Sequence, residues 1–196
     1  FSVCSVINQP PTISGVPNQQ AAEDIDLALD VSPYINDPDD DNSTLAITED
    51  SNYAAVNGQT MTFNYPEGIL TEEVTITVSD GKAAASQKTT VNVTPVNDPP
   101  ALSAITNLEV NYKQALDNVY DLYDYARDPD DNDNELTYEI TVNTQAKCGA
   151  AIGNNRFVDV APDSAFIGLS NLTIRATDPD GLWDEESFLI RVNPGA

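Results

Sequence analysis

Short runs in which hydrophobic and polar residues alternate recur along the whole chain. Residues 27–31 and 74–78 form two of them in the first half, and residues 172–176 and 188–192 are similar runs in the second half. Successive side chains of a β-strand point to opposite faces, so each run places one face in a core and the other in water. No stretch predicts a helix of more than a turn or two, although residues 117–126 are the best candidate, and the sequence predicts an all-β fold.

The second half of the chain repeats the first. Tyr-Ile-Asn-Asp-Pro-Asp-Asp at residues 34–40 recurs as Tyr-Ala-Arg-Asp-Pro-Asp-Asp at residues 125–131, which is 91 positions later. An Asp-Gly pair at Asp80 recurs as Asp-Pro-Asp-Gly at Asp178, 98 positions later. The second copy therefore contains about seven additional residues between Leu136 and Asp178, and Cys148 lies in that interval.

Each copy has the length of an immunoglobulin-like sandwich, which takes about 100 residues. The junction at residues 95–100 contains three prolines, which cannot donate hydrogen bonds to a sheet and favour a short, stiff linker. The sequence therefore predicts two tandem Greek-key β-sandwiches. Their expected bounds are an N-terminal strand at residues 1–9, repeat 1 at residues 10–97 and repeat 2 at residues 98–196.

The charge of the chain is strongly negative. Asp and Glu number 32 against 8 Lys and Arg, with no His, for a formal net charge of −24. Such a field repels nucleic acid and anionic lipid, so the expected partners are cations or basic surfaces. The 40% hydrophobic content is enough for a folded core, and no stretch predicts insertion into a membrane.

Two aspartate-rich loops, residues 37–42 and 128–134, occupy the same position in the two copies. Crowded carboxylates repel one another unless a cation lies among them, and Ca²⁺ prefers six to eight oxygen ligands from flexible loops. An EF-hand does not fit, because Asn42 stands where glycine is required and Thr48 where glutamate is required. The loops predict Ca²⁺ binding, and the alternative is a solvated run of charges.

At this point the chain resembles cadherin-like repeats, including tandem calcium-binding repeats of bacterial and archaeal surface proteins. The resemblance covers most of both copies and rests on Glu23-Asp24, Asp37-Pro38-Asp39, residues 78–81 and residues 91–100. It implies Ca²⁺ held at the junction between repeats, in an extracellular protein. The implied ligands at the junction are Asn97, Asp98, Asp128, Asp130 and Asp178, with Glu23 or Glu67 of the preceding repeat as further candidates.

The resemblance also implies a matching set in repeat 1. Its members are Asp37, Asp39 and Asp80. The linker residue Gln9 stands where repeat 2 has aspartate, which makes this site weaker by one charge or dependent on ligands from another domain.

The first seven residues align with the last strand of repeat 1, although no repeat precedes them in this chain. Two interpretations stay open: the chain is a segment of a longer adhesin with neighbouring repeats, or this strand joins the sheet of a neighbouring subunit in head-to-tail self-association. Cys4 and Cys148 would then form a disulfide between subunits; a bridge within one chain and two free thiols are the alternatives.

Three Asn-x-Ser/Thr triplets offer glycosylation sites, at Asn42, Asn92 and Asn171. Enzyme activity is not expected, because the chain has no histidine and no nucleophile or phosphate-binding motif. The predicted function is that of an extracellular protein rigidified by Ca²⁺, with a structural or adhesive role, as a filament subunit or an adhesin segment. The alternative is a calcium-dependent carbohydrate-binding module, in which the sugar would stack on Tyr112, Tyr120, Tyr123, Tyr125 or Trp183.

Overall fold

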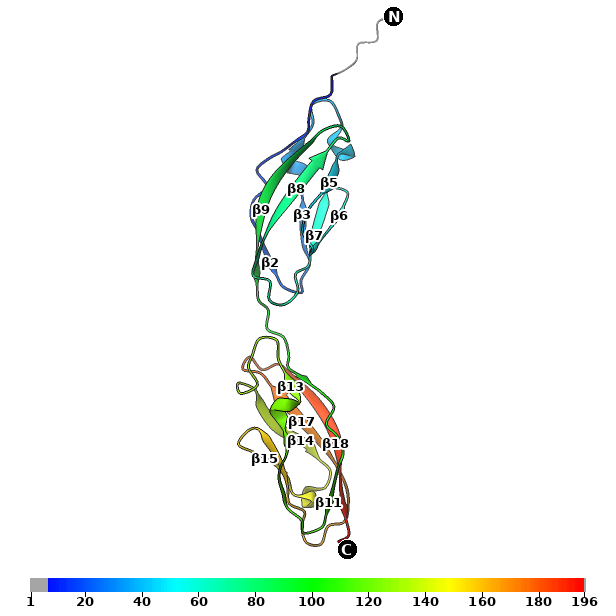
Figure 1. The fold of residues 1–196 in the computed structure, drawn as a ribbon, viewed down its shortest axis with the longest axis vertical. Helices are drawn as coiled ribbons and strands as arrows, with labels where there is room; N and C mark the ends of the chain where they lie inside the picture. Colours follow the sequence, from blue (N-terminus) through cyan, green and yellow to red (C-terminus); the bar gives the residue numbers. More distant parts are fainter. Residues whose placement is uncertain (1–6, 196) are drawn as a thin grey trace, which may run out of the picture. The chain divides into compact units, whose positions relative to one another are not determined.

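A computed structural model describes residues 7–195 of the protein and divides the chain into two compact units (Figure 1). Unit 1 ends at Val96 and unit 2 begins at Asn97. Both units are built from β-strands, and the helical segments among the described residues are four short 3-10 turns. The all-β prediction is therefore confirmed.

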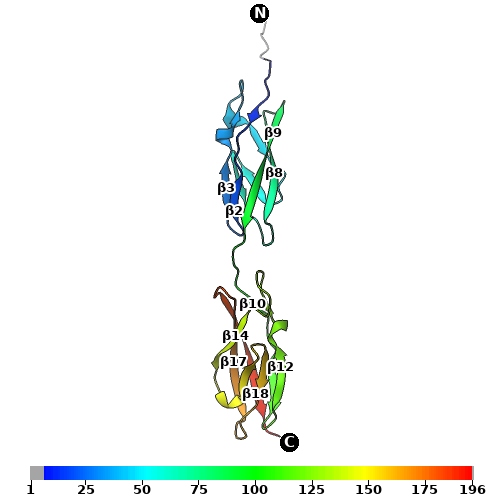
Figure 2. The same cartoon turned by 90° about the vertical axis from the view of Figure 1, so that its left-hand side faces the viewer.

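Unit 1 consists of two facing sheets and a short strand pair (Figures 1 and 2). The larger sheet has the strand order β2-β9-β8-β5, the smaller one has the order β3-β7-β6, and β1 pairs with β4. Strand β2 runs parallel to β9, whereas the other pairs are antiparallel. The strands are β1 (Thr12–Ile13), β2 (Gln19–Ala22), β3 (Leu27–Asp30), β4 (Ile35–Asn36), β5 (Ala46–Thr48), β6 (Ala54–Asn57), β7 (Thr60–Phe63), β8 (Thr71–Ser79) and β9 (Ala84–Thr94).

Unit 2 repeats this topology strand for strand. Its sheets have the orders β11-β18-β17-β14 and β12-β16-β15, and β10 pairs with β13. Here β11 is the strand that runs parallel to the last one, β18. The strands are β10 (Ala101–Leu102), β11 (Leu108–Asn111), β12 (Leu116–Asp121), β13 (Ala126–Arg127), β14 (Thr137–Asn143), β15 (Ala150–Gly153), β16 (Phe157–Val160), β17 (Gly168–Thr177) and β18 (Trp183–Asn193).

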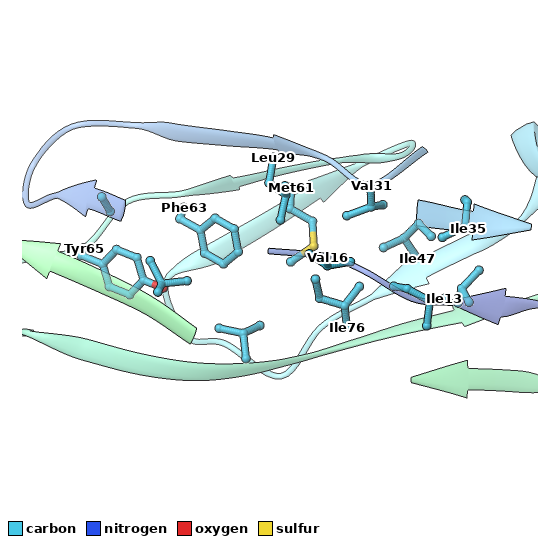
Figure 3. Packing of buried hydrophobic residues seen from close by; sticks show 14 of the residues in the cluster. Ile13, Val16, Leu29, Val31, Ile35, Ile47, Met61, Phe63, Tyr65 and Ile76 are labelled. Atoms are coloured by element: carbon cyan, nitrogen blue, oxygen red, sulfur yellow. The ribbon is translucent and has the colours of Figure 1, made fainter. Parts of the chain in front are cut away.

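Each unit has its own hydrophobic core between its two sheets. In unit 1 the alternation within β8 buries Val74, Ile76 and Val78 completely, as the sequence pattern predicts. Figure 3 shows Ile76 facing Met61 and Phe63 of the opposite sheet. Because each unit has a complete core of its own, the loops at the ends of the strands are not needed to hold the sheets together and can carry polar, functional residues.

Residues 117–126, the best candidate for a short helix, form the end of a strand and one short turn. Strand β12 occupies Leu116–Asp121 and is followed by a 3-10 turn at Leu122–Asp124. The register of β12 against β16 shifts between Leu116 and Tyr120, which interrupts the regular alternation of a strand. Asn118, at φ 54°, has a left-handed backbone conformation that no α-helix tolerates.

The additional residues of unit 2 lie mainly between β14 and β15. Strand β14 is longer than its counterpart β5, and a 3-10 turn at Ala146–Cys148 follows it. Cys148 is fully buried in the core of unit 2. Gly149 ends the turn at φ 70°, where a side chain would collide with the carbonyl oxygen of Ala161. Cys4, the predicted disulfide partner, lies outside the described residues, as does most of the predicted N-terminal strand.

Candidate metal centres

In unit 1 the aspartate-rich loop follows β4 and is folded by its own side chains. Oδ1 of Asp37 accepts the backbone N–H groups of Asp39 and Asp40, each at 2.9 Å. Asn42 braces the loop, because its Oδ1 accepts the N–H of Asp37 at 2.8 Å and its Nδ2 donates to the carbonyl of Ile35 at 3.2 Å. One carboxylate oxygen from each of the three aspartates then lies within 4.8 Å of the other two.

The second oxygen of Asp37 has an unusual environment. Asp37 is only 8% exposed, and its Oδ2 is buried without any hydrogen-bond partner. A buried, unpaired carboxylate oxygen is costly, and most such atoms in folded proteins have a partner. A cation among the three carboxylates would supply that partner.

Asn8 and Gln9 bring the start of unit 1 to this loop. Nδ2 of Asn8 donates to Oδ2 of Asp80 at 2.8 Å, and the N–H of Gln9 donates to Oδ1 of Asp39 at 3.1 Å. The N–H groups of Ala83 and Lys82 also bond to Asp80, and together with Asn8 they lower the pKa of its carboxyl to about 2. Asp80 is therefore ionised at neutral pH and offers a charged oxygen at the edge of the loop.

A lysine lies beside the same loop. Nζ of Lys82 donates to Oδ1 of Asn8 at 2.8 Å and lies 3.7 Å from Oδ2 of Asp40. The side chain is 63% exposed, so water screens this ion pair strongly. Unit 1 therefore carries a positive charge of its own at the acidic loop.

Unit 2 builds the equivalent loop after β13. Oδ1 of Asp128 accepts the N–H groups of Asp130 and Asp131, at 2.9 and 3.0 Å. Its Oδ2 is buried without a hydrogen-bond partner, as at Asp37. Oxygens of Asp128, Asp131 and Asp178 lie within 4.8 Å of one another. The two copies thus repeat the same turn and the same unpaired oxygen.

The start of unit 2 approaches its loop as in unit 1. Nδ2 of Asn97 donates to Oδ2 of Asp178 at 2.7 Å, and the N–H of Asp98 donates to Oδ2 of Asp130 at 2.9 Å. Asp178 is 5% exposed. Burial alone raises its pKa, but hydrogen bonds from Asn97 and from the N–H groups of Leu182 and Gly181 outweigh burial, and the net pKa is lowered.

Asp131 behaves in the opposite way. Loss of solvent raises the pKa of its carboxyl, and the negative charge of Asp128 adds to the effect. Carboxylates that repel one another in this way favour a bound cation or a proton. A divalent cation in unit 2 would therefore relieve both the repulsion at Asp131 and the unpaired oxygen of Asp128.

The predicted aspartates divide into those inside the clusters and those beside them. Asp37, Asp39, Asp128 and Asp178 belong to the three-carboxylate clusters of the two loops. Asp130 accepts the N–H of Asp98, and Asp80 accepts a bond from Asn8, which precedes the Gln9 that donates to Asp39. Asp40 and Asp131 belong to the clusters but are not among the residues singled out from the sequence. Their position as the last aspartate of Asp-Pro-Asp-Asp in both copies is the signal that could have found them.

Glu23 and Glu67 are not part of the aspartate cluster of unit 1. Glu23 is 1% exposed, and its carboxylate accepts the N–H of Val96 at 2.5 Å, just past the end of β9. Asp80 precedes the start of the same eleven-residue strand, so Glu23 and Asp80 lie near its opposite ends. Glu67 is exposed. Neither glutamate serves the Asp37 loop.

Most of the aromatic residues considered for sugar binding are partly or wholly buried. Tyr120 is 9% exposed, and Tyr123 and Tyr125 pack against the core of unit 2, as does Tyr112. Trp183 is 51% exposed, and the guanidinium of Arg175 lies 4.3 Å from its ring centroid. Trp183 is therefore the one of these five with a large exposed surface.

The three glycosylation triplets have partly buried asparagines. Asn92 lies in β9 and Asn171 in β17, each within a paired strand. Both ends of the Asn42 amide are used to brace the metal loop, so a glycan on its Nδ2 would break the bond to Ile35. The structure thus argues against modification of Asn42, and the other two positions stay predictions.

The donors in both loops suit Ca²⁺ better than a softer metal. They are carboxylate oxygens on flexible turns, whereas zinc prefers nitrogen and sulfur ligands in tetrahedral sites. Mg²⁺ fits less well because it keeps most of its waters and demands near-octahedral geometry.

No protein-family model matches the sequence, and no curated protein matches it either. Solved structures do resemble it. The human protocadherin-24 EC1-2 structure aligns with 96% of this chain and 100% of its own, at 17% identity and a TM-score of 0.60. The human desmocollin-1 ectodomain aligns with 96% of this chain at 12% identity and a TM-score of 0.58. The chain has a cadherin-like fold.

The chain spans only part of several of these structures. It covers 41% of the desmocollin-1 ectodomain. An endo-fucoidan hydrolase of glycoside hydrolase family 107 is also similar, at 17% identity and a TM-score of 0.42, and this chain covers 29% of it. Among the described residues, no helix has the length and apolar character needed to span a bilayer.

Proposed function

We propose that this chain is a calcium-binding extracellular protein with a structural or adhesive role and no enzymatic activity. The observation that carries the proposal is the buried, unpartnered oxygen of Asp37, which recurs at Asp128 in the second unit. Two units repeat a geometry that is costly without a cation. The cadherin-like fold supports the same conclusion, because it places such loops at one end of each sandwich.

Binding of Ca²⁺ stabilises the folded protein, because the unfolded chain cannot hold the carboxylates together. The stabilisation is about 2.7 kcal/mol when free Ca²⁺ is a hundred times its Kd. For units of this size that corresponds to a rise in Tm of roughly 10 °C. Thermal unfolding in Ca²⁺ and in chelator measures the rise directly.

The control for this experiment is Mg²⁺ at the same ionic strength, which tests whether screening of the −24 net charge is enough. A rise in Tm that is equal in Mg²⁺ and Ca²⁺ would count against a specific site. If Tm rises in neither Ca²⁺ nor Mg²⁺, the aspartate loops are solvated runs of charge, and the proposal loses its basis.

The calcium site of unit 2 is further proposed to lie at the junction of the repeats. Asn97 and Asp98 of the linker would join Asp128, Asp130 and Asp178, and Glu23 and Glu67 of the preceding repeat are the remaining candidates. Calcium there would fix the angle between the repeats. Small-angle scattering checks this: the maximum dimension should vary less among conformers in Ca²⁺ than in chelator, and equal flexibility in both would refute it.

The proposal extends to self-association. Chains would join head to tail through the N-terminal strand, as subunits of a cell-surface filament, or the two repeats would be part of a longer adhesin. A disulfide between Cys4 of one chain and Cys148 of the next would make the contact covalent. Electrophoresis without reductant then shows a ladder that Cys4→Ser abolishes; a single monomer band contradicts the covalent link.

Carbohydrate binding is the second candidate, and the exposed Trp183 is the observation that favours it. One face of its indole is covered by Arg175, so a sugar would stack on the other face. Retention on immobilised acidic and neutral polysaccharides, lost in Trp183→Ala, would support this function. Equal elution of both proteins from every matrix would exclude it.

A further inference from the structure

We propose that Lys82 is a built-in competitor for the metal site of unit 1, so that this site binds Ca²⁺ more weakly than the site of unit 2. The inference rests on the proposed function, since it concerns the order in which the two calcium sites fill. It adds that the repeats are not equivalent: unit 2 is loaded at low Ca²⁺ concentrations and unit 1 only at higher ones.

The first step is that the loop of unit 1 is built to receive a cation. Asp37 is more than nine-tenths buried and its Oδ2 has no hydrogen-bond partner, and a carboxylate oxygen of Asp37 lies within 4.8 Å of one from Asp39 and one from Asp40. The unpaired atom itself points to a positive ligand, independently of the number of aspartates around it.

The second step is that a positive group of the protein already lies at the edge of this loop. The Lys82 ammonium is 3.7 Å from the carboxylate of Asp40 and 2.8 Å from the amide oxygen of Asn8. Asn8 is bonded in turn to Asp80. A metal ion that uses Asp40 must therefore bind next to the ammonium or displace it.

The third step is that unit 2 lacks this group. Its corresponding turn, between β17 and β18, carries Asp180 and no lysine. Unit 2 does have an arginine at its loop, Arg127, but Arg127 pairs with Asp133 at 3.7 Å. Within the described part of unit 2, no lysine or arginine forms an ion pair with the three clustered carboxylates, those of Asp128, Asp131 and Asp178. Asn97 keeps the bond to Asp178 that Asn8 makes to Asp80, so the hydrogen-bond frame is the same and the charge differs.

The size of the effect follows from electrostatics. A single charge repels a divalent ion at 5 to 8 Å in water by an amount that changes affinity roughly three- to tenfold, after screening by salt. The loss of one linker charge at Gln9 acts in the same direction. The affinities of the two sites should therefore differ by about tenfold or more.

The experiment follows both sites separately in the full chain. In a calcium titration monitored by ¹⁵N–¹H spectra, the N–H groups of Asp39 and Asp40 report on unit 1, and those of Asp130 and Asp131 report on unit 2. Each donates to the carboxylate at the centre of its own loop. The titration yields two Kd values from one sample.

Lys82→Met is the test variant, since it keeps the length of the side chain and removes the charge. The Kd of unit 1 should fall roughly three- to tenfold, while that of unit 2 stays constant. Lys82→Arg keeps the charge and should leave both values near those of the wild type. Lys88→Met removes an equal charge from β9, where Lys88 forms an exposed ion pair with Glu73 of β8, and serves as the matched control.

The possible outcomes separate the two proposals. Equal Kd values in the wild type, or an unchanged unit 1 in Lys82→Met, overturn the competitor role while calcium binding stands. A fall of the same size in Lys88→Met also overturns it, because net charge alone would then be responsible. If neither loop shows a calcium-dependent shift, the proposed calcium-binding function is refuted, and the role of Lys82 is refuted with it.

Discussion

The aspartate-rich loops of the two units share one backbone geometry and differ in the charges around it. In each, the first aspartate accepts two N–H groups and keeps one buried oxygen unpaired, at Asp37 and at Asp128. Unit 1 has Lys82 in the turn after β8, whereas the corresponding turn of unit 2 contains Asp180 and no lysine, and unit 1 has Gln9 where unit 2 has Asp98. If the proposed function holds, the turn fixes where a cation binds, and the neighbouring charges set the affinity.

The largest expected effect comes from the same substitution in both loops. Asp37→Asn and Asp128→Asn keep an oxygen that can accept the two N–H groups, so the turn survives while one charge is lost. Each variant should lose most of the calcium stabilisation of its own unit, about 2–3 kcal/mol at saturating Ca²⁺. In chelator each should be as stable as the wild type or slightly more so, because an unpaired buried charge is removed.

Unfolding in Ca²⁺ and in chelator, followed by circular dichroism, checks both statements. If Asp128→Asn retains the full calcium effect, the unpaired oxygen does not mark the site. If both variants are destabilised equally in chelator, the carboxylates are needed for the turn and not for a metal.

A second substitution makes unit 1 more like unit 2. Gln9→Asp supplies the missing linker charge next to Asp39, to which the backbone of Gln9 already donates. The calcium affinity of unit 1 should rise roughly three- to tenfold, as measured from the N–H signals of its loop. Gln20→Glu adds the same charge on exposed β2 and should change nothing; an equal rise there would show that only net charge matters.

The smallest expected effect on stability concerns a turn that occurs in both units, at Asp30 and at Asp121, but binds an arginine only in unit 2. Asp30 and Asp121 each accept an N–H two residues later, and only Asp121 also binds an arginine, Arg156, through two nitrogens. Gln59 is the residue at the position of Arg156 in unit 1, because the carbonyls of both accept equivalent N–H groups. Arg156→Gln therefore transfers the arrangement of unit 1 to unit 2.

The pH dependence of this variant follows from the lowered pKa of Asp121. The hydrogen bond from Arg156 lowers that pKa below the unfolded value of about 3.9, so the pair stabilises the fold above that pH. The stabilisation, about 1 kcal/mol at pH 7, is lost as the pH falls below about 4. Urea unfolding in chelator at pH 7 and pH 3, followed by fluorescence of the single tryptophan in unit 2, should show a larger deficit for Arg156→Gln at pH 7 than at pH 3. An equal deficit at both pH values would mean that packing of Arg156 on Tyr123 dominates.

The sequence predicted the strands well wherever hydrophobic and polar residues alternate along the chain. Alternation located β8 and β17, because every second side chain of these strands points into the core between the two sheets and is mostly apolar. Alternation was least informative at residues 117–126, where the register of β12 shifts and Asn118 has a left-handed backbone conformation. Bulges depend on partners far away in the chain, and no local pattern encodes them.

The site was predicted in part for a similar reason. Repetition of Asp-Pro-Asp-Asp identified the loops, since carboxylates crowded at the same position of both copies repel one another unless a cation binds them. It could not separate Asp39 from Asp40 or Asp130 from Asp131, because the folding of the turn decides which oxygens converge. The role of Lys82 depends on the approach of Asn8, 74 residues away, so it was invisible until the fold was known.

The parallel pairing of the strands near the two ends of each unit has a mechanical consequence. In unit 1 the ladder joins Gln19–Ala22 to residues 91–94, and in unit 2 it joins Leu108–Asn111 to residues 190–193. A pull on the two ends of one unit acts along these strands in opposite directions and loads the whole ladder in shear. The hydrogen bonds must then fail together and not one after another, so each unit is suited to carry tension.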